Sequence, residues 1–204
     1  MNTFFSRRGV NIDISNACAL ECPNCPRQFQ FRDRGLRVPG KNLTINDFKK
    51  VSNFFDSIDF EGQLSDPVHN PNFIEMLKIC KQNNNRVEIH NASSGKKKDW
   101  YYKAFEANPK ASWVFSIDGL PSRSFIYRIN QDGEKLFDVM KSARLCLDVK
   151  PTWQYIVFSY NENEIDEAIK LANKIDVNFY LLLSSRWLSK SDPLMPSEAY
   201  RAAK

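Results

Sequence analysis

Six stretches of the chain are strand-like, 9–15, 57–62, 85–93, 112–119, 152–159 and 177–184, and in the first four of them hydrophobic and polar residues alternate with a period of two. This period is typical of β-strands. Five intervening stretches place apolar residues at helical spacing: 43–55, 70–83, 97–108, 133–147 and 163–175. Strands that alternate with helices along a chain predict a parallel sheet built from successive βα units.

One face of the first four predicted strands is polar. Its residues are Asn11, Asp13, Asp59, Glu61, Glu88, His90, Ser116 and Asp118. Parallel strands covered by helices on both faces are usually apolar throughout, so this pattern does not fit a flat, doubly covered sheet. We expect an α/β fold, a partial (β/α)6 TIM-like barrel with helices outside and a polar concave interior. In such barrels the functional residues lie at the C-terminal ends of the strands.

Local signals place several helix ends. Thr44 is a good N-cap for the first helix, and Pro71 is expected at the start of the second. We expect residues 1–204 to form a single domain, because this length supports one core. The tail, 185–204, is expected to be partly irregular, with a short helix after Pro196.

Composition narrows the class of protein. The chain is 42% hydrophobic, 13% aromatic and 26% charged, which is typical of a globular protein rather than a disordered one. No apolar run approaches the roughly 20 residues that span a bilayer, and the N-terminus has no signal-peptide pattern. We therefore expect a cytoplasmic protein without membrane contact, whose five cysteines are reduced.

The net charge is +5, and several arginines follow one another near the first strand: Arg27, Arg32, Arg34 and Arg37. A basic surface can attract an acidic partner. The run Lys96–Lys98 is expected to be solvated surface. Because the chain contains none of the nucleic-acid-binding motifs, nucleic acid is not an expected partner.

Three cysteines lie together in the loop 16–27, directly after the first predicted strand. Cys18, Cys22 and Cys25 have the spacing C-x₃-C-x₂-C. Thiolates bind metals, so the loop predicts a metal or cluster site. Structural zinc would need a fourth ligand, which His69 or His90 could supply, since Cys80 and Cys146 are expected on apolar helix faces in the core. A [4Fe–4S] cluster usually has four cysteine ligands, so three would leave one iron open.

The cysteine loop resembles the signature of the radical S-adenosylmethionine (radical SAM) superfamily. The resemblance implies a [4Fe–4S] cluster at Cys18, Cys22 and Cys25. It also implies SAM bound at the open iron and cleaved reductively to a 5′-deoxyadenosyl radical that abstracts hydrogen from a substrate.

Two further loops correspond to SAM-binding positions of this superfamily. Leu64 and Ser65 replace two glycines, and Asp66 and Pro67 stand at a Glu-Pro pair that receives the SAM amino group. The backbone from Gln63 to Ser65 could accept hydrogen bonds from that group. The third strand, which in this superfamily often ends in Thr-Asn-Gly, ends here in His90, Asn91 and Ala92. His90 has two possible roles: it contacts SAM or the substrate, or it forms its hydrogen bonds with other residues of the barrel interior.

The fourth strand, "FSIDG" followed by "YR", is similar to that of the peptide-modifying, SPASM-type group. The similarity implies that Ser116 and Asp118 contact the SAM carboxylate or ribose. Arg128 corresponds to the arginine that follows this strand in the group, and its alternative role is a structural salt bridge. Asn24 stands where an aromatic residue often precedes the third cysteine. No cysteine follows Cys146, so we expect a core-only member without auxiliary clusters.

Partners and substrate follow from the same resemblance. It implies reduced flavodoxin or ferredoxin as electron donor, steered by the arginines after the cysteine loop, and a peptide or small-metabolite substrate. Candidate substrate-selecting residues are Asp13, Glu61, Glu88, Gln154, Phe29 and Phe31. We expect a monomer. The alternative function is a non-catalytic protein that binds SAM and an iron–sulfur cluster on the same fold.

Overall fold

The computed structural model describes residues 8–184, 186–187 and 189–201. Its centre is a single six-stranded sheet in the order β1-β2-β3-β4-β5-β6, in which every neighbouring pair is parallel. The strands are β1 (Gly9–Asn11), β2 (Ser57–Phe60), β3 (Arg86–Asn91), β4 (Ser112–Ser116), β5 (Thr152–Val157) and β6 (Asn178–Leu183). Sequential parallel strands confirm the predicted βα units.

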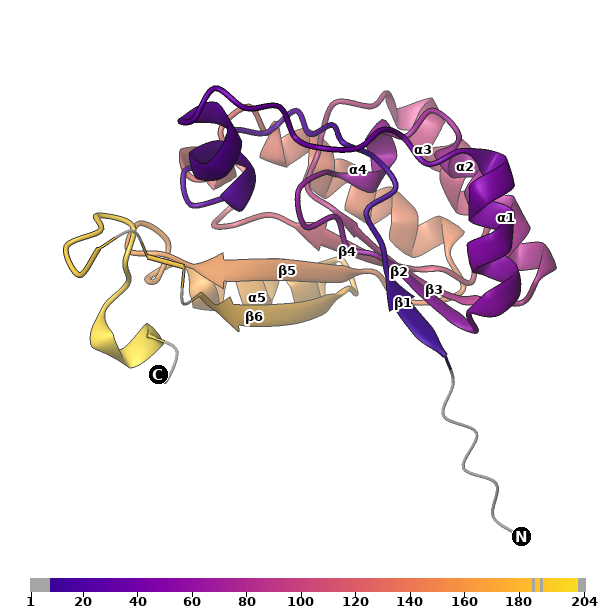
Figure 1. Cartoon of the computed structure of the whole chain (residues 1–204). Coiled ribbons are helices and arrows are strands. Elements are labelled where there is room, and N and C mark those ends of the chain that lie inside the picture. The colour runs from indigo at the N-terminus through magenta and orange to yellow at the C-terminus, as the bar shows by residue number, and fades with distance from the viewer. Residues whose placement is uncertain (1–7, 185, 188, 202–204) are drawn as a thin grey trace, which may run out of the picture.

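Helices connect the strands and cover the outer face of the sheet (Figure 1). They are α1 (Ile45–Phe54), α2 (Phe73–Gln82), α3 (Lys98–Ala107), α4 (Gly133–Cys146) and α5 (Ile165–Lys174). The short turns are a π-helix at Gln28–Arg32 and 3₁₀ helices at Pro67–His69, Ser124–Ile126 and Glu198–Tyr200. The last of these is the short helix expected after Pro196.

The hydrophobic core lies between the sheet and the helices. Alternate strand residues point into it, among them Ile58, Ile89, Trp113 and Trp153, all at most 1% exposed. The helices add one apolar face each, which for α2 consists of Phe73, Met76, Leu77, Ile79 and Cys80. Cys80 is therefore a core residue, as predicted, whereas Cys146 is only half-buried at the end of α4. The opposite face of the sheet is left for the concave interior.

The predicted bounds of the first strand and the second helix are wrong. β1 pairs only over Gly9–Asn11; Ile12 N still donates to the Asp59 carbonyl, but the chain then leaves the sheet, and the Ile14 carbonyl accepts from Leu43 N and from Asn70 Nδ2. The second helix begins at Phe73 rather than at Pro71. The predicted N-cap at Thr44 is confirmed, since its side chain accepts a hydrogen bond from Asp47 N.

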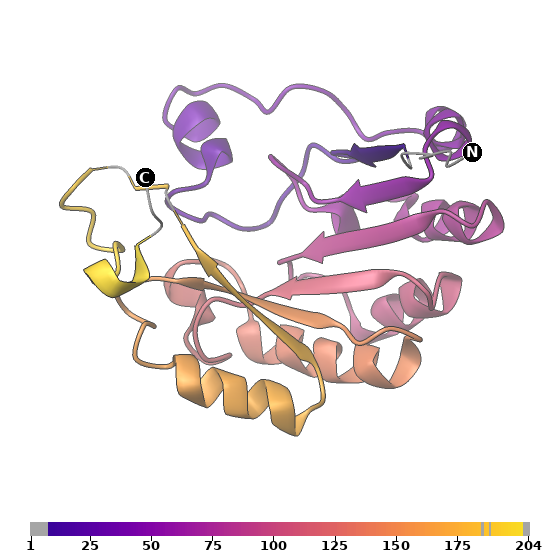
Figure 2. The ribbon, with the colours of Figure 1, turned by 90° about the horizontal axis from the view of Figure 1, so that it is seen from below.

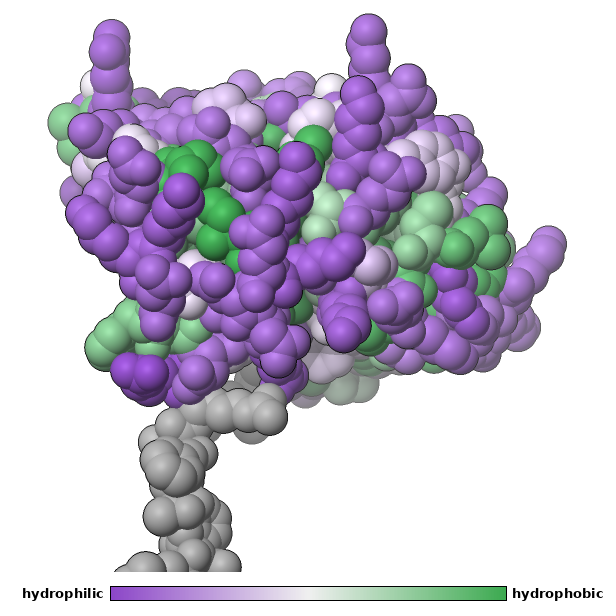
Figure 3. Space-filling view, turned by 90° about the vertical axis from the view of Figure 1, so that its right-hand side faces the viewer, coloured by the Kyte–Doolittle hydropathy of each residue, from purple (hydrophilic) through white to green (hydrophobic). Residues whose placement is uncertain are grey.

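Polar side chains dominate the outer surface on the side of the molecule shown in Figure 3, with hydrophobic residues in small separate patches. Such scattered apolar residues are normal for a folded domain. Among the described residues, no helix is both long enough and apolar enough to cross a bilayer.

Candidate functional site

A cavity of about 340 Å³ opens at the C-terminal ends of the strands, on the concave side of the sheet. Figure 2 shows the cysteine loop arching over this end of the sheet, with the C-terminal segment at the same end. Strands β3, β4 and β5 each place one polar side chain on the cavity wall: His90, Ser116 and Gln154. β5 and β6 also contribute the apolar Ile156 and Leu182. The wall therefore changes from polar to apolar across the sheet.

The cysteine loop forms one side of this cavity, and all three of its thiols lie on the wall. Burial raises the pKa of Cys18 to about 11 and that of Cys22 to about 12. Among the described residues, no group of three or more His, Cys, Asp or Glu side chains is arranged around a single metal ion. Ligands of a cluster stand farther apart than ligands of one ion, and three thiols facing one cavity match that donor set.

Neighbouring segments hold the cysteine loop in place. Arg27 donates from Nη1 to the carbonyls of Asn16 and Leu64, at 2.9 and 2.8 Å, and so ties the loop to the segment after β2. The Asp66 backbone N–H donates to the Ala17 carbonyl in the same interface. Arg27 thus points inward and lines the cavity, instead of standing on the surface with the arginines that follow it.

The segment after β2 reaches the cavity with Gln63, Leu64, Ser65 and Asp66. Gly62 turns the chain there with a φ of 65°, and an added Cβ would lie 2.4 Å from the Ser65 carbonyl oxygen, so only glycine fits. Asp13 holds the turn by accepting from Gln63 N at 3.0 Å and from Ser65 Oγ at 2.6 Å.

The Asp66 carboxylate is only 3% exposed and is surrounded by backbone donors. It accepts from the N–H groups of Ala92 and Ser93, at 2.9 and 2.8 Å, and from that of Val68 at 3.2 Å. Burial raises its pKa, although these three hydrogen bonds favour the charged form. Asp66 therefore connects the β2 loop to the end of β3.

The two residues predicted at the end of β3 differ in position. His90 lies on the cavity wall, where its Nε2 is 2.9 Å from the Glu88 carboxylate. Asn91 is fully buried on the helix side, donates to the Tyr101 hydroxyl and does not line the cavity. The strand alternation that places His90 inward necessarily turns Asn91 outward.

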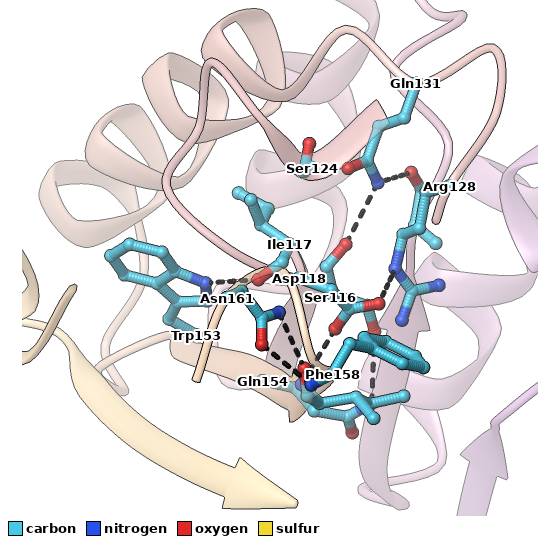
Figure 4. Close-up of polar contacts among 12 residues, drawn as sticks. Ser116, Ile117, Asp118, Ser124, Arg128, Gln131, Trp153, Gln154, Phe158 and Asn161 are labelled. Atoms are coloured by element: carbon cyan, nitrogen blue, oxygen red, sulfur yellow. Dashed lines mark hydrogen bonds and ion pairs between the residues drawn. The ribbon is translucent and has the colours of Figure 1, made fainter. Parts of the chain in front are cut away.

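The end of β4 forms a buried polar network with β5 (Figure 4). Asp118 is 0% exposed; its carboxylate accepts from Ile156 N at 2.8 Å and forms an ion pair with Arg128 Nε at 2.7 Å. Burial tends to lower the pKa of Arg128, but Asp118 outweighs this and raises it, so the guanidinium stays charged. Ser116 and Arg128 line the cavity, whereas Asp118 lies behind its wall.

Gln131 completes this network. Its Nε2 donates to the carbonyls of Ser116 and Ala92, at 3.0 and 2.6 Å, and so joins the ends of β4 and β3 (Figure 4). The side chains behind the wall thus fix the strand ends, and those on the wall remain accessible.

Several residues of the cavity wall are not among the predicted site residues. They include Tyr127, Leu183, Ser184 and Arg186; Leu183 is the last residue of β6, and Ser184 and Arg186 follow it. Among the predicted substrate-selecting residues, Glu61 and Gln154 are on the wall, whereas Asp13, Glu88 and Phe31 are not. The Phe29 side chain lies outside the described part of the structure.

No protein-family model and no curated protein sequence matches the chain. Solved structures do. SuiB from Streptococcus suis bound to S-adenosylmethionine superposes with a TM-score of 0.70 at 14% identity, over 93% of this chain and 43% of that one. SuiB bound to its precursor peptide SuiA gives 0.68 at 15% identity, over 86% and 39%. A radical SAM methyltransferase from Sphaerobacter thermophilus gives 0.67 at 12% identity, over 97% and 62%.

The chain spans about two fifths of the length of SuiB. At these identities the superpositions establish the architecture: six parallel strands in an open, partial TIM barrel with helices outside. The fold of this chain is the partial barrel of radical SAM enzymes.

Proposed function

We propose that this chain is a radical SAM enzyme that holds a [4Fe–4S] cluster through Cys18, Cys22 and Cys25. The observation that carries the proposal is the convergence of these three thiols on one cavity at the C-terminal ends of the strands, in a fold shared with SAM-binding enzymes. When bound, the cluster supplies the electron that cleaves SAM to a 5′-deoxyadenosyl radical, which abstracts hydrogen from the substrate. The protein's own task is to bind and orient SAM and the substrate and to exclude water from the cavity.

The residues at the cavity fall into two groups, those proposed to contact SAM and those proposed to position other groups. His90, Ser116 and Arg128 have polar groups on the cavity wall and are proposed to contact SAM directly. Arg128 is suited to bind the SAM carboxylate. Asp118 holds its Nε, and the residue itself lies on the cavity wall, where the rest of the guanidinium can meet a carboxylate. Asp118, Asn91 and Asp66 are proposed to act by positioning, since their polar groups bond mainly to the protein itself.

The backbone of residues 63–65 is the proposed acceptor for the SAM amino group. The Leu64 carbonyl already accepts from Arg27, so the carbonyls of Gln63 and Ser65 are the better candidates. This engagement of Leu64, together with the missing glycines, motivates the alternative function, a non-catalytic protein that binds SAM and the cluster.

We propose a peptide or small-metabolite substrate and a flavodoxin or ferredoxin as reductant. The structural neighbour SuiB has been captured with its precursor peptide, which supports the peptide class. Arg32, Arg34 and Arg37 are exposed beyond the cysteine loop and could attract an acidic donor. We further propose that residues 1–204 form one domain and that the chain is monomeric and cytoplasmic.

Anaerobic reconstitution tests the proposal. The protein should take up about four irons per chain and, when reduced, should convert SAM to 5′-deoxyadenosine. Cys18→Ala, Cys22→Ala and Cys25→Ala should each abolish iron uptake, whereas Cys146→Ala, a half-buried cysteine outside the cavity, should not. A protein without four irons would overturn the proposal. A cluster with SAM binding by calorimetry, but without 5′-deoxyadenosine, would establish the non-catalytic alternative.

A further inference from the structure

Asn24, between the second and third cysteines, is only 2% exposed. Its Nδ2 donates to the Arg186 carbonyl at 3.0 Å and to the Asp192 carboxylate at 3.1 Å, so both amide hydrogens are used. Both acceptors fix the orientation of the amide, because a flipped side chain would turn its oxygen toward two other oxygens. Asn24 thus bonds to residues that are more than 160 positions away in the chain.

These partners belong to what we call the C-terminal segment, residues 186–194, of which residue 188 lies outside the described part of the structure. The segment is held independently at its far end. Ser159, two residues after β5, donates from Oγ to the Pro193 carbonyl at 2.6 Å and from N to the Leu194 carbonyl at 3.1 Å. The segment therefore has two separate attachments, one to the cysteine loop and one to the turn after β5.

Between these attachments the segment packs against apolar side chains beside the cysteines. Trp187 meets Phe158 edge to face, with ring centroids 5.9 Å apart, and Phe158 in turn packs on Tyr127 at 4.1 Å. Trp187 and Leu194 join the hydrophobic cluster that contains Leu20 and Cys22 and that Cys18 and Cys25 border. The segment also brings Arg186 to the cavity wall.

We propose that Asn24 is a positioning residue that holds the C-terminal segment against the cysteine loop, and that the held segment shields the cysteines from water. This inference rests on the proposed function, because it concerns the environment of the cluster. It also accounts for a polar residue where an aromatic one is common: two hydrogen-bond donors are needed at this position, and Trp187 supplies an aromatic ring beside the loop from elsewhere in the chain.

Solvent exposure is one of the quantities that set the potential of an iron–sulfur cluster. Reduction adds a negative charge, and water stabilises that charge better than an apolar surround does. Loosening the C-terminal segment should therefore make the cluster easier to reduce. A residue that merely contributed to folding would not change the potential of the folded protein.

The experiment compares four full-length proteins: wild type, Asn24→Ala, Ser159→Ala and Asn83→Ala. Ser159→Ala removes the 2.6 Å bond at the far end of the segment without touching the cysteine loop. Asn83→Ala is the matched control, because Asn83 makes its two side-chain bonds with Ser52 and Asn53, far along the chain from the loop. The first measurement is the tryptic cleavage rate after Lys190 in the cluster-free proteins. The second is the reduction potential of the reconstituted cluster.

We expect trypsin to cleave Asn24→Ala about tenfold faster than wild type, as the loss of two hydrogen bonds implies. Ser159→Ala should be cleaved severalfold faster than wild type, and Asn83→Ala at the wild-type rate. The potential should shift to more positive values in Asn24→Ala and Ser159→Ala and stay unchanged in Asn83→Ala.

Unchanged cleavage in Asn24→Ala would overturn the inference, and so would a potential that moves in Asn24→Ala but not in Ser159→Ala. If the wild type took up no cluster, the proposed function would fail, while the cleavage rates would still decide whether Asn24 holds the segment.

Discussion

The two sides of the cavity use their polar groups in different ways. On the cysteine side, the only hydrogen bond to the three thiols among the described residues is a long one, 3.5 Å, from Leu20 N to Cys18. At the strand ends, the carboxylates of Asp66 and Asp118 are almost or fully buried, and each accepts hydrogen bonds from the backbone. One side keeps its groups available, and the other uses them to hold strand ends together.

This difference separates residues that bind from residues that position. A group that is to ligate a metal must remain accessible, whereas a carboxylate with two or three backbone donors is already satisfied. Family resemblance at a sequence position therefore does not by itself fix the role of a residue. The resemblance leads one to expect Asp66 at a SAM-contacting position, yet three of its four lone-pair directions are directed at this chain's own N–H groups.

The largest expected effect is at the Asp118–Arg128 pair. Arg128→Met should leave a fully buried carboxylate without its cation and lower the free energy of unfolding by about 4 kcal/mol. The loss should shrink as the pH falls. Burial raises the pKa of Asp118 and Arg128 lowers it, so without Arg128 the folded carboxyl binds its proton at a higher pH than the unfolded one. Urea denaturation of the metal-free protein between pH 5 and about 8 measures both effects.

The control for this prediction is the double variant Asp118→Asn with Arg128→Met, which removes both charges. It should recover part of the stability, because no ion is left buried. A single variant as stable as wild type would mean that the pair is not a positioning element, and the contrast between the two sides of the cavity would lose its main support.

Asp66→Ala should lower the free energy of unfolding by about 3 kcal/mol, because it removes the acceptor of the Val68 and Ala92 N–H groups and leaves that of Ser93 only its 3.2 Å bond to Asn91 Oδ1. Asp66→Asn keeps one acceptor oxygen and should lose about half as much. Thermal or urea unfolding of the metal-free proteins measures the difference. Equal stability of Asp66→Ala and wild type would show that Asp66 is available for a ligand after all.

Much of this arrangement could be predicted from the sequence. The period-two strands, the intervening helices and the polar inner positions led to an open barrel, and the structure has that sheet order. The wall positions of His90 and Ser116 followed from alternation alone. These features are local, since each depends on spacing within a few residues.

The rest depends on contacts between distant segments. Nothing near Asn24 indicates that Arg186 and Asp192 lie beside it. Asp118 follows the inward alternation of β4, yet Arg128 and the backbone of β5 cover it. The π-helix at Gln28–Arg32 has no periodic signal, because five residues are too few to show one. Side-chain burial at loop ends is a tertiary property, so spacing cannot reveal it.

Arg27→Met tests the link between the two sides. Its guanidinium donates to the carbonyls of Asn16 and Leu64, so its loss should lower the free energy of unfolding by about 1–2 kcal/mol. The freed Leu64 carbonyl would then be available to a SAM amino group. Hydrogen exchange of residues 16–27 and 62–66 should increase together in the variant. Faster exchange in only one of these segments would show that Arg27 does not connect them.

The smallest effect on stability is expected on the cysteine side itself. Cys25→Ala in the metal-free protein should change the free energy of unfolding by less than about 1 kcal/mol, because the thiol is half-buried and little apolar area is lost. The same substitution should abolish iron uptake. This separation, a small effect on folding with a complete effect on the cluster, is the reverse of what Asp66→Ala should give. A Cys25→Ala protein as destabilised as Asp66→Ala would mean that the thiols also hold the fold, and the two sides of the cavity would not differ.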